Sequence, residues 1–349
     1  MIGTKERWLK TLRCPRCHSR LRFGLRLSTK DLDSDGLACE QCPESFPIID
    51  DIPRLLLPPL REALLENGPV NGIDEHQVNT ALSFGFEWAS FPQMYKEWQQ
   101  SFLNYMQPHG PEFFRGKKVL DAGCGNGRFA YYASKYGAEV WAIDLGPAVQ
   151  VARRNTETLV NVEVIQADLY HPPFAFESFD FIYSIGVLHH LPEPESAFRN
   201  LLEYLKPGGE IQIYLYWKPE GQPIKRGLLA LVGMGRKVTR RLPHSLVYAL
   251  AFPAAVASYG FFVWPYRILK RIPVLANFAE KFPMKQYASF PFRVCVNDQL
   301  DRFSAPIENR YTRQEVTDWL NRAGLEAIDT QPAFGWVGSG RKPVAGNVE

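Results

Sequence analysis

The chain has 349 residues, 46% of them hydrophobic, and a net charge of only +3. These values fit an ordered globular protein with room for a full α/β domain and additional segments, and they exclude a chain that binds polyanions through its overall composition. The first residues, MIGTKERWLKTLRCPRC, mix charges throughout and contain no hydrophobic signal core. We therefore expect a cytoplasmic protein.

Two C-x2-C pairs, Cys14-Pro-Arg-Cys17 and Cys39-Glu-Gln-Cys42, stand 21 residues apart near the N-terminus. This spacing predicts a tetrahedral Zn²⁺ site with four thiolate ligands. Four protein ligands leave no open coordination position, so the zinc would be structural. Disulfides are the alternative, and a reducing compartment argues against them. The two remaining cysteines, Cys124 and Cys295, are expected to be packed small side chains.

The cysteine pairs and the following ESFPIIDDIPRLL resemble the small zinc-ribbon proteins that activate methyltransferases as separate subunits. The resemblance covers residues 10–57, and we expect a zinc-ribbon domain over residues 1–58. It implies a stabilising or partner-docking role. A ribbon that grips RNA is the alternative, although such ribbons tend to carry three cysteines and a histidine.

Residues 59–115 are expected to form a linker and a helical flap. The linker, Leu60 to Asn79, begins after Pro58-Pro59, and the segment SFGFEWASFPQMYKEWQQSFLNYM then concentrates aromatic residues. We expect these side chains to pack against the following domain.

The segment KKVLDAGCGNGRFAYYASKYGAEVWAIDLG predicts a buried strand, a glycine-rich turn and a helix from Arg128 to Tyr136. Glycines in such a turn let a ligand approach the backbone, and the free N–H groups of the helix start suit an anion. The spacing Gly123-x-Gly125-x-Gly127 departs from the dinucleotide fingerprint, and the Lys-Ser/Thr pair of a Walker loop is missing.

Three aspartates stand at the ends of successive predicted strands: Asp121, Asp144 and Asp168. The carboxyl ends of parallel strands face one crevice, where a carboxylate can accept hydrogen bonds from ribose hydroxyls. A fourth strand spans Phe179 to Ser184 and is followed by a loop, a helix, a Pro-Gly-Gly turn and a fifth strand.

Residues 116–217 resemble the core of class I S-adenosylmethionine (SAM)-dependent methyltransferases. Five motifs match in order: VLDAGCGNG, VWAIDLG, QADLY, FDFIYSIGVLHHL and LKPGGEIQI. The resemblance implies an α/β, Rossmann-like seven-stranded sheet in the order 3-2-1-4-5-7-6, with strand 7 antiparallel and helices on both faces. Residues 218–309 would be a helical insert, and residues 310–349 would supply the last helix and the last two strands.

The resemblance also implies the SAM site. The glycine loop would hold the amino-acid tail beside Asp121, Asp144 would bind the ribose, and Asp168 and Leu169 would bind the adenine. Trp88 and Phe91 of the flap would shield the sulfonium. The residues expected around the cofactor are Asp121, Gly123, Cys124, Gly125, Gly127, Asp144, Leu145, Asp168, Leu169 and Ser184.

His189 and His190 follow the fourth strand, next to the expected position of the methyl group. A histidine can accept a proton near neutral pH, so each is a candidate general base. The alternative is that they only shape the loop. The preceding Ser-Ile-Gly-Val differs from the Asn/Asp-Pro-Pro-aromatic motif of enzymes that methylate exocyclic amines or glutamine amides.

The insert is basic and contains a long apolar run. Residues 217–300 hold 13 Lys/Arg and 3 Asp/Glu, a local net charge of +10, and Leu242 to Tyr266 lacks all four charged residue types. Pro253, Gly260 and Pro265 argue against a membrane span. We expect either a helical cap on the catalytic domain or a hairpin at the membrane interface. RNA binding fits the charge but not the apolar run. The flanking basic residues are Arg240, Arg241, Arg267, Lys270 and Arg271.

The remaining sequence predicts a helix in YTRQEVTDWLNRAGLEAI, then the sixth and last strands. Just before it, DRFSAPIENRYT is expected to form a loop from which Asp301, Arg310 and Tyr311 reach the substrate, or serve as turn and capping residues.

These observations predict a SAM-dependent methyltransferase with a structural zinc ion, in the cytoplasm or peripheral at the inner face of the membrane. The substrate would be a small or lipid-linked molecule methylated at oxygen or carbon, as in envelope-glycan, quinone-like or secondary-metabolite pathways. Two alternatives remain: an rRNA or tRNA methyltransferase, and a non-catalytic SAM-fold protein that docks a partner through the ribbon.

Overall fold

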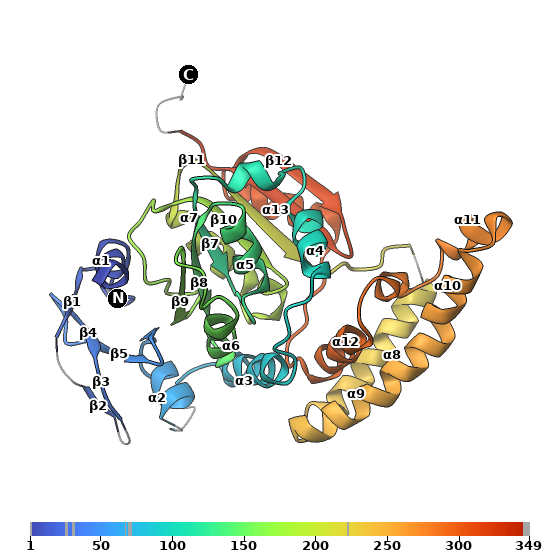
Figure 1. The fold of residues 1–349 in the computed structure, drawn as a ribbon, viewed down its shortest axis with the longest axis horizontal. Helices are drawn as coiled ribbons and strands as arrows, with labels where there is room; N and C mark the ends of the chain where they lie inside the picture. The colour runs from blue at the N-terminus through green and yellow to red at the C-terminus, as the bar shows by residue number, and fades with distance from the viewer. Residues whose placement is uncertain are drawn as a thin grey trace.

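The computed structural model describes residues 2–24, 27–29, 32–66, 68, 72–221 and 223–344, and most strands belong to one mixed sheet. The sheet has 11 strands in the order β1-β4-β5-β6-β9-β8-β7-β10-β11-β13-β12 (Figure 1). Its central strands are β7 (Lys118–Ala122), β8 (Glu139–Asp144), β9 (Val162–Ala167), β10 (Phe179–Ile185), β11 (Leu205–Leu215), β12 (Glu326–Pro332) and β13 (Trp336–Arg341).

These seven strands follow the expected order 3-2-1-4-5-7-6, and β13 is antiparallel to β11. The prediction of a seven-stranded sheet was nevertheless wrong, because β6 (Ile52–Leu55) adds to the open edge. It pairs in parallel with β9, with Arg54 opposite Gln166 and Leu55 opposite Ala167. The strands β5 (Ser45–Ile49), β4 (Gly36–Cys39) and β1 (Leu21–Phe23) continue the sheet in antiparallel pairs. The ribbon thus covers backbone groups that an edge strand would leave unpaired.

Helices cover both faces of the central sheet, because successive strand residues point to opposite sides. In β8, Trp141 and Ile143 belong to one buried cluster, together with α7 (Pro194–Glu203) and α13 (Arg313–Arg322). Val140 and Ala142 belong to the other, together with α4 (Glu97–Met106), α5 (Arg128–Lys135) and α6 (Ala148–Asn155).

The helix α1 (Ile2–Thr11) ties the ribbon to the central sheet. Trp8 Nε1 donates to Glu163 Oε2 at 2.8 Å, and Lys118 Nζ donates to Thr11 Oγ1 at 2.6 Å. Backbone bonds run from Arg13 N to Pro173 O and from Ala175 N to Thr11 O. The ribbon therefore has both sheet and side-chain contacts with the rest of the molecule. A small hairpin of β2 (Leu27–Thr29) and β3 (Leu32–Ser34) completes it.

The expected linker contains more helix than predicted: α2 (Leu60–Leu65) and the start of α3 (Glu75–Ser90) lie within it, while residues 67 and 69–71 fall outside the described residues. The flap helix α3 lies tightly against the turn after β8. A Cβ on Gly85 would come within 2.3 Å of Pro147 Cγ, and one on Gly146 within 2.4 Å of Ala81 O. The flap is thus fixed at the carboxyl end of the sheet. A 3-10 turn, Pro111–Phe114, leads from α4 towards β7.

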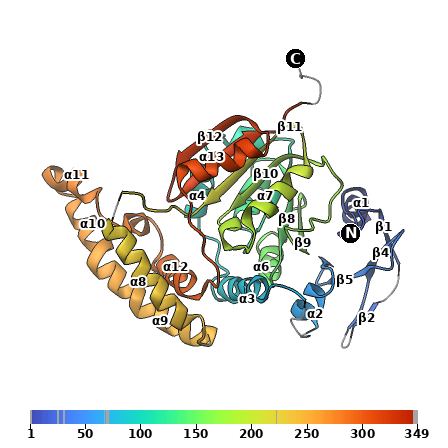
Figure 2. The same ribbon diagram turned by 180° about the vertical axis from the view of Figure 1, so that it is seen from behind.

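The insert forms a helical arm that stands beside the central domain, at the opposite end from the ribbon (Figures 1 and 2). Its helices are α8 (Pro223–Thr239), α9 (His244–Ser258), α10 (Trp264–Leu269), α11 (Ala276–Ala279) and α12 (Phe292–Ser304). The arm has its own apolar cluster, which also includes Phe91 and Trp98.

The apolar run forms one continuous helix, His244–Leu269, of 26 residues, although it contains Pro253, Gly260 and Pro265. Pro253 lies inside α9, and a π-helical turn at Tyr259–Val263 joins α9 to α10. By length and composition this is the one helix in the described part of the chain that could cross a membrane, and only 33% of its most apolar window is buried. The expected loop at Asp301 is also shorter than predicted, because α12 continues to Ser304.

Candidate active site

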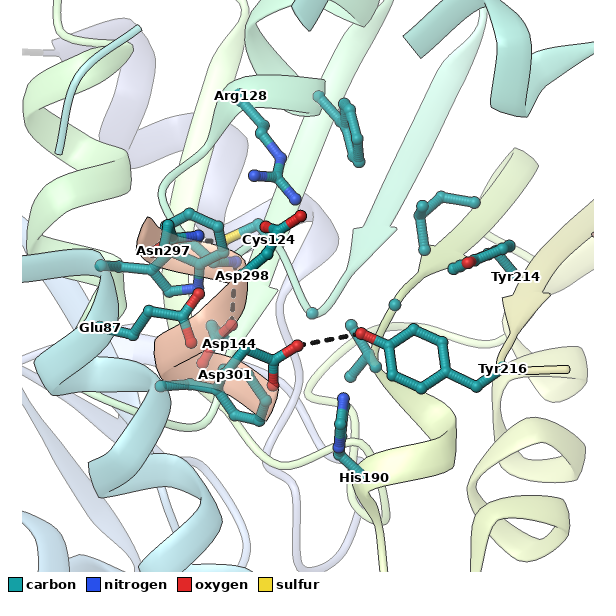
Figure 3. A pocket seen from close by; sticks show the side chains of 18 of the residues that line it. Glu87, Cys124, Arg128, Asp144, His190, Tyr214, Tyr216, Asn297, Asp298 and Asp301 are labelled. Atoms are coloured by element: carbon teal, nitrogen blue, oxygen red, sulfur yellow. Dashed lines mark hydrogen bonds between the residues drawn. The ribbon is translucent and has the colours of Figure 1, made fainter. Parts of the chain in front are cut away.

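A cavity of about 380 Å³ opens at the carboxyl ends of β7, β8, β9 and β10, under the flap (Figure 3). Its walls come from these strand ends, from α3 and α4 of the flap, and from α12 of the arm. Eight of the residues expected at the cofactor or catalytic site line it: Gly123, Cys124, Gly125, Asp144, Leu145, Asp168, Leu169 and His190. Arg310 also lines it, whereas Tyr311 does not.

The glycine loop needs its glycines for both conformation and space. Gly123, Gly125 and Gly127 all have positive φ, at 93°, 52° and 79°. A Cβ on Gly123 would come within 2.3 Å of Val187 Cγ2, and one on Gly125 within 2.8 Å of Trp88 Nε1. Any other residue would therefore be strained and would also displace a side chain that borders the cavity.

Asp144 holds the glycine loop against the end of β8. Its Oδ2 accepts from Gly125 N and its Oδ1 from Gly146 N, both at 2.9 Å. Burial raises the pKa of this carboxyl, and the two backbone N–H groups oppose the shift. Each oxygen keeps a second lone pair for a ligand hydroxyl.

Asp168 is fixed by three neighbours. Its Oδ1 accepts from Gln77 Nε2 at 3.0 Å and from Tyr170 N at 3.1 Å, and its Oδ2 pairs with His171 Nδ1 at 3.1 Å. This hydrogen bond raises the pKa of His171. Because Gln77 belongs to α3, the carboxylate also anchors the flap to the sheet.

Four of the expected residues lie behind the cavity wall. Asp121 is 2% exposed, and burial raises its pKa to about 7. Gly127 is the N-cap residue of α5, and Ser184 donates from Oγ to Ala122 O. His189 is fully buried beside Tyr216, and burial holds its pKa well below the usual value. These four residues are not among those that line the cavity.

His190 differs from its neighbour because it borders the cavity. Its Nδ1 lies 2.6 Å from Ile307 O, so Nδ1 carries the proton and Nε2 is left as an acceptor. The ring also packs against Phe84 of the flap, with ring centroids 4.8 Å apart.

The two flap residues that were expected to cover the cofactor, Trp88 and Phe91, lie in different places in the structure. Trp88 lines the cavity above Gly125. Phe91 follows the last residue of α3 and instead packs in the arm cluster, 5.6 Å from Tyr248 between ring centroids.

Sequence reasoning missed one side of the cavity. Its polar residues come from segments far apart in the chain: Glu87, Arg128, Tyr105, Tyr214, Tyr216, Asn297 and Asp298. The available signal was the charge pattern of α12, where Asn297, Asp298 and Asp301 fall at helical spacing in an otherwise basic insert.

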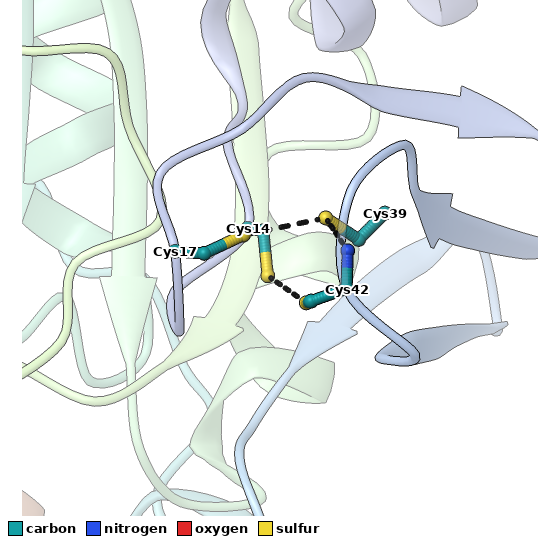
Figure 4. A group of neighbouring side chains, drawn as sticks. All are labelled: Cys14, Cys17, Cys39 and Cys42. Atoms are coloured by element: carbon teal, nitrogen blue, oxygen red, sulfur yellow. Dashed lines mark hydrogen bonds between the residues drawn. The ribbon is translucent and has the colours of Figure 1, made fainter.

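The four N-terminal cysteines form a separate cluster within the ribbon (Figure 4). Their Sγ atoms lie within 4.8 Å of one another, with 3.6 Å from Cys14 to Cys42 and 3.4 Å from Cys17 to Cys39. Zn–S bonds of about 2.3 Å give Sγ–Sγ distances of roughly 3.8 Å in a tetrahedron, whereas a disulfide needs about 2.05 Å. The cluster therefore fits zinc, and all six cysteines are free of disulfides.

Comparison with known proteins finds a family match for the part of the chain that forms the strands around the cavity. Residues 120–213 match the family described as "Methyltransferase domain". This part of the chain is a methyltransferase domain.

Curated relatives match the same region. The ubiquinone biosynthesis O-methyltransferase of Proteus mirabilis is 31% identical over 145 residues, which are 40% of this chain and 59% of that protein. The enzyme of the same name from Aliivibrio fischeri is 35% identical over 134 residues, which are 38% of this chain and 55% of that protein. The chain thus spans little more than half the length of these relatives, and the ribbon and arm lie outside the methyltransferase domain.

Two solved structures are similar over more of the chain. A SAM-dependent methyltransferase from Aquifex aeolicus is 18% identical, with a TM-score of 0.40, covering 74% of this chain and 96% of that one. A chain of the complex between the Haloferax volcanii Trm112 methyltransferase activator and a methyltransferase is 15% identical, with a TM-score of 0.43, covering 78% and 99%.

Proposed function

We propose that the chain is a SAM-dependent methyltransferase that transfers a methyl group to an oxygen or carbon of a small or lipid-linked molecule. The observation that carries this proposal is the glycine loop, held by Asp144 at the mouth of the cavity within the methyltransferase domain. The curated relatives named O-methyltransferases favour oxygen as the acceptor atom.

The residues around the loop suit each part of SAM. The ligand's amino-acid tail would lie along Gly123 and Gly125, its ribose on Asp144, and its adenine beside Leu145, Asp168 and Leu169. Cys124 would border the tail, while Asp121, Gly127 and Ser184 support the wall from behind. Trp88 would exclude water from the sulfonium.

Methyl transfer is an in-line displacement, so holding acceptor and methyl carbon in line supplies most of the rate enhancement, up to roughly 7–11 kcal/mol. A base is needed only when the acceptor begins protonated. Of the two candidate histidines, His190 can reach the cavity through Nε2, whereas His189 is enclosed by protein.

Titration with SAM by calorimetry tests the proposal. Asp144→Ala removes the acceptor for two ribose hydroxyls, and each lost charged hydrogen bond costs about 1.5–3 kcal/mol, so affinity should fall at least tenfold. Asp318→Ala in α13 is the matched control and should bind like the wild type. Equal affinity in both variants, or no SAM binding by the wild type, would refute the assignment.

We also propose a structural zinc ion on Cys14, Cys17, Cys39 and Cys42. Elemental analysis should find one zinc per chain. Cys14→Ser should lower the melting temperature of the protein, because metal binding supplies much of the folding free energy in such small modules. A protein that contains no zinc, or that melts identically after Cys14→Ser, contradicts the assignment.

The helical arm favours a membrane surface as a second partner. The continuous helix His244–Leu269 has one face that is buried through Val247, Ala251 and Ala255, and its other faces expose large apolar side chains. These are Leu246, Leu250, Phe252, Val256, Phe261, Trp264 and Ile268. Arg240, Arg241, Arg267, Lys270 and Arg271 are exposed around them. Basic and apolar side chains together fit an anionic bilayer interface, with about 1 kcal/mol per basic residue. RNA would leave the apolar side chains unused.

This arrangement would place the enzyme on the inner face of the membrane, with the rest of the chain in the cytoplasm. Anionic vesicles should sediment the protein at low salt and release it as salt rises. The double variant with Phe261→Ser and Trp264→Ser should bind at least tenfold more weakly, and Val160→Ser, an exposed apolar residue of the central domain, should not. Equal recovery with anionic, neutral and no vesicles would contradict membrane docking and leave the arm as a cap.

The ribbon offers less support for the partner-docking alternative. Its β6 edge and its helix α1 are already paired with the central sheet, so the surfaces most suited to another protein are used within this chain. A protein that binds SAM but transfers no methyl group to any acceptor would restore that alternative.

A further inference from the structure

The cavity extends beyond the glycine loop into a polar region built from four elements. We call it the acceptor pocket; it contains Glu87 of α3, Arg128 of α5, Tyr216 after β11, and Asn297, Asp298 and Asp301 of α12. Figure 3 shows Glu87, Asp301 and Tyr216 converging from different elements around the same space.

Several buried polar atoms in this pocket have no hydrogen-bond partner in the described part of the chain. They include Glu87 Oε2, Asn297 Oδ1, Asp301 Oδ1 and Trp98 Nε1. Glu87 and Asn297 are only 2% and 5% exposed. A buried polar atom left unpaired costs about 1–3 kcal/mol, so a group of them around one cavity indicates a ligand that pairs with them.

Arg128 adds donors on the opposite wall. Its guanidinium stacks on Trp98 and Trp88, 4.3 and 4.6 Å from the ring centroids. Among the described residues no carboxylate lies within 4.0 Å of it. The guanidinium therefore offers N–H groups to the cavity while balancing the nearby carboxylates Glu87 and Asp298.

The combination of donors and acceptors narrows the ligand class. A long apolar group would leave the buried oxygens unpaired. A ligand of either charge would meet side chains of its own sign, because carboxylates such as Glu87 and Asp298 and the guanidinium of Arg128 all line the cavity. A hydroxyl group both donates and accepts, so a molecule with several hydroxyls can pair with carboxylate, amide and guanidinium at once. The rings of Trp88, Trp98 and Phe290 supply apolar faces for its C–H groups.

We infer that the acceptor pocket binds a neutral, polyhydroxylated molecule such as a sugar ring, and that Asp301 accepts the proton of the hydroxyl that is methylated. This inference rests on the proposed function, since it places the methyl acceptor beside the SAM site.

Asp301 is positioned for that step by Tyr216. The Tyr216 hydroxyl donates to Asp301 Oδ2 at 3.0 Å, which leaves Oδ1 buried and without a partner among the described residues, in a side chain that lines the cavity. Both residues lie on the side of the cavity bordered by His190, with ring centroids of His190 and Tyr216 5.5 Å apart. The acceptor oxygen would form a bond to the methyl carbon as its proton passes to Asp301 Oδ1. The carbon–sulfur bond breaks with its electron pair going to sulfur, which gives S-adenosylhomocysteine.

Saturation-transfer NMR on the full chain with S-adenosylhomocysteine tests the pocket without requiring turnover. The probes are methyl mannoside, methyl glucoside, methyl rhamnoside and myo-inositol, with choline and spermidine as cationic comparisons. At least one neutral polyol should receive saturation, and the two amines should not. Asn297→Leu and Glu87→Gln should each weaken polyol binding at least fivefold, whereas Glu195→Gln in α7 should not.

The outcomes separate the two proposals. If SAM does not bind the wild type, the proposed function fails. If SAM binds but no polyol is saturated, if the amines are preferred, or if Asn297→Leu leaves polyol binding unchanged, the acceptor pocket is wrongly assigned and the SAM site stands. Calorimetry with SAM on each variant verifies that it is folded, because the substituted side chains lie outside the SAM half of the cavity.

Discussion

The two halves of the cavity are built in different ways. The SAM half is formed mainly by one stretch of chain, from the glycine loop to His190, and α3 covers it with Gln77 and Trp88. The acceptor half is formed by side chains of α3, α5, β11 and α12, and its last contributors lie more than 200 residues after the first.

The difference indicates that one half can change while the other is kept. A backbone loop fixed by glycines tolerates few substitutions, because both dihedral angles and space are constrained. Side chains on a helix of an insert can be replaced without altering the sheet. We therefore expect substitutions in each half to affect one ligand and to spare the other.

The largest effect is expected from Asp301→Asn, which removes the proton acceptor and keeps the shape of the side chain. General base catalysis contributes about 10²–10⁴-fold, so S-adenosylhomocysteine formation with a hydroxylated acceptor should slow at least 100-fold, with SAM affinity unchanged. Tyr216→Phe leaves the carboxylate in place and should reduce the rate less. A rate within threefold of wild type for Asp301→Asn would show that the hydroxyl loses its proton elsewhere.

A smaller loss, of SAM affinity, is expected from Gly123→Ala. The new Cβ would meet Val187 at 2.3 Å in a backbone conformation with positive φ, which alone costs a non-glycine residue roughly 1–2 kcal/mol. Calorimetry should show SAM binding at least tenfold weaker, and polyol saturation should persist. Gly227→Ala, where nothing lies within 4 Å of the added Cβ, is the control. Loss of polyol binding in Gly123→Ala would mean that the halves are coupled.

The smallest effect concerns stability and pH. Burial raises the pKa of Asp298 to about 6 from the usual value near 3.8. The folded protein favours the neutral form of this carboxyl. The free energy of unfolding is therefore higher when Asp298 is protonated, and it falls as the pH rises from about 4 through 6. The shift corresponds to at most about 3 kcal/mol, and water in the cavity should reduce it to about 1 kcal/mol.

Asp298→Asn removes that pH-dependent cost. Relative to wild type, its melting temperature should rise by about 2 °C at pH 8 and change little at pH 4. The same measurement on Asp318→Asn, on an outer helix, corrects for general charge effects. A variant that is less stable at pH 8 would indicate that the hydrogen bond from the Tyr287 hydroxyl to Asp298 Oδ2 outweighs the cost of burying the charge.

The sequence was sufficient for elements whose signals are local. The five motifs and the cysteine cluster follow from short segments with a clear pattern, and the order of the seven central strands is implied by the family resemblance that the motifs carry. The pairing of β6 with β9 could not be predicted, because it joins residues more than 100 positions apart and depends on an edge that only the folded sheet creates.

The acceptor pocket was missed for a similar reason. Asp301 was predicted to reach the substrate, although from a loop, whereas Glu87 and Asn297 join it only because the fold brings α3 and α12 together. The histidines His189 and His190 show that residues adjacent in the sequence can also be hard to assign. Adjacent histidines have the same motif context, yet one borders the cavity and the other is enclosed, because a single 3-10 turn points them in different directions.

A short hydrogen-bonded path joins the ribbon to the SAM half of the cavity. Arg54 of β6 is 2% exposed and donates from Nη1 to Gln166 Oε1 at 2.9 Å. Gln166 Nε2 in turn donates to Leu145 O at 2.8 Å, in the residue next to Asp144. The strand β6 of the ribbon therefore fixes the Leu145 carbonyl, next to Asp144.

We expect this path to link the proposed zinc and SAM sites thermodynamically. If removal of zinc by a chelator weakens SAM binding by a given factor, SAM must tighten zinc binding by the same factor. Saturating SAM should then slow or reduce zinc extraction from the wild type, and Arg54→Leu should remove that protection while leaving the four cysteines intact. Under zinc limitation, the protein molecules that hold SAM would be the last to lose their metal.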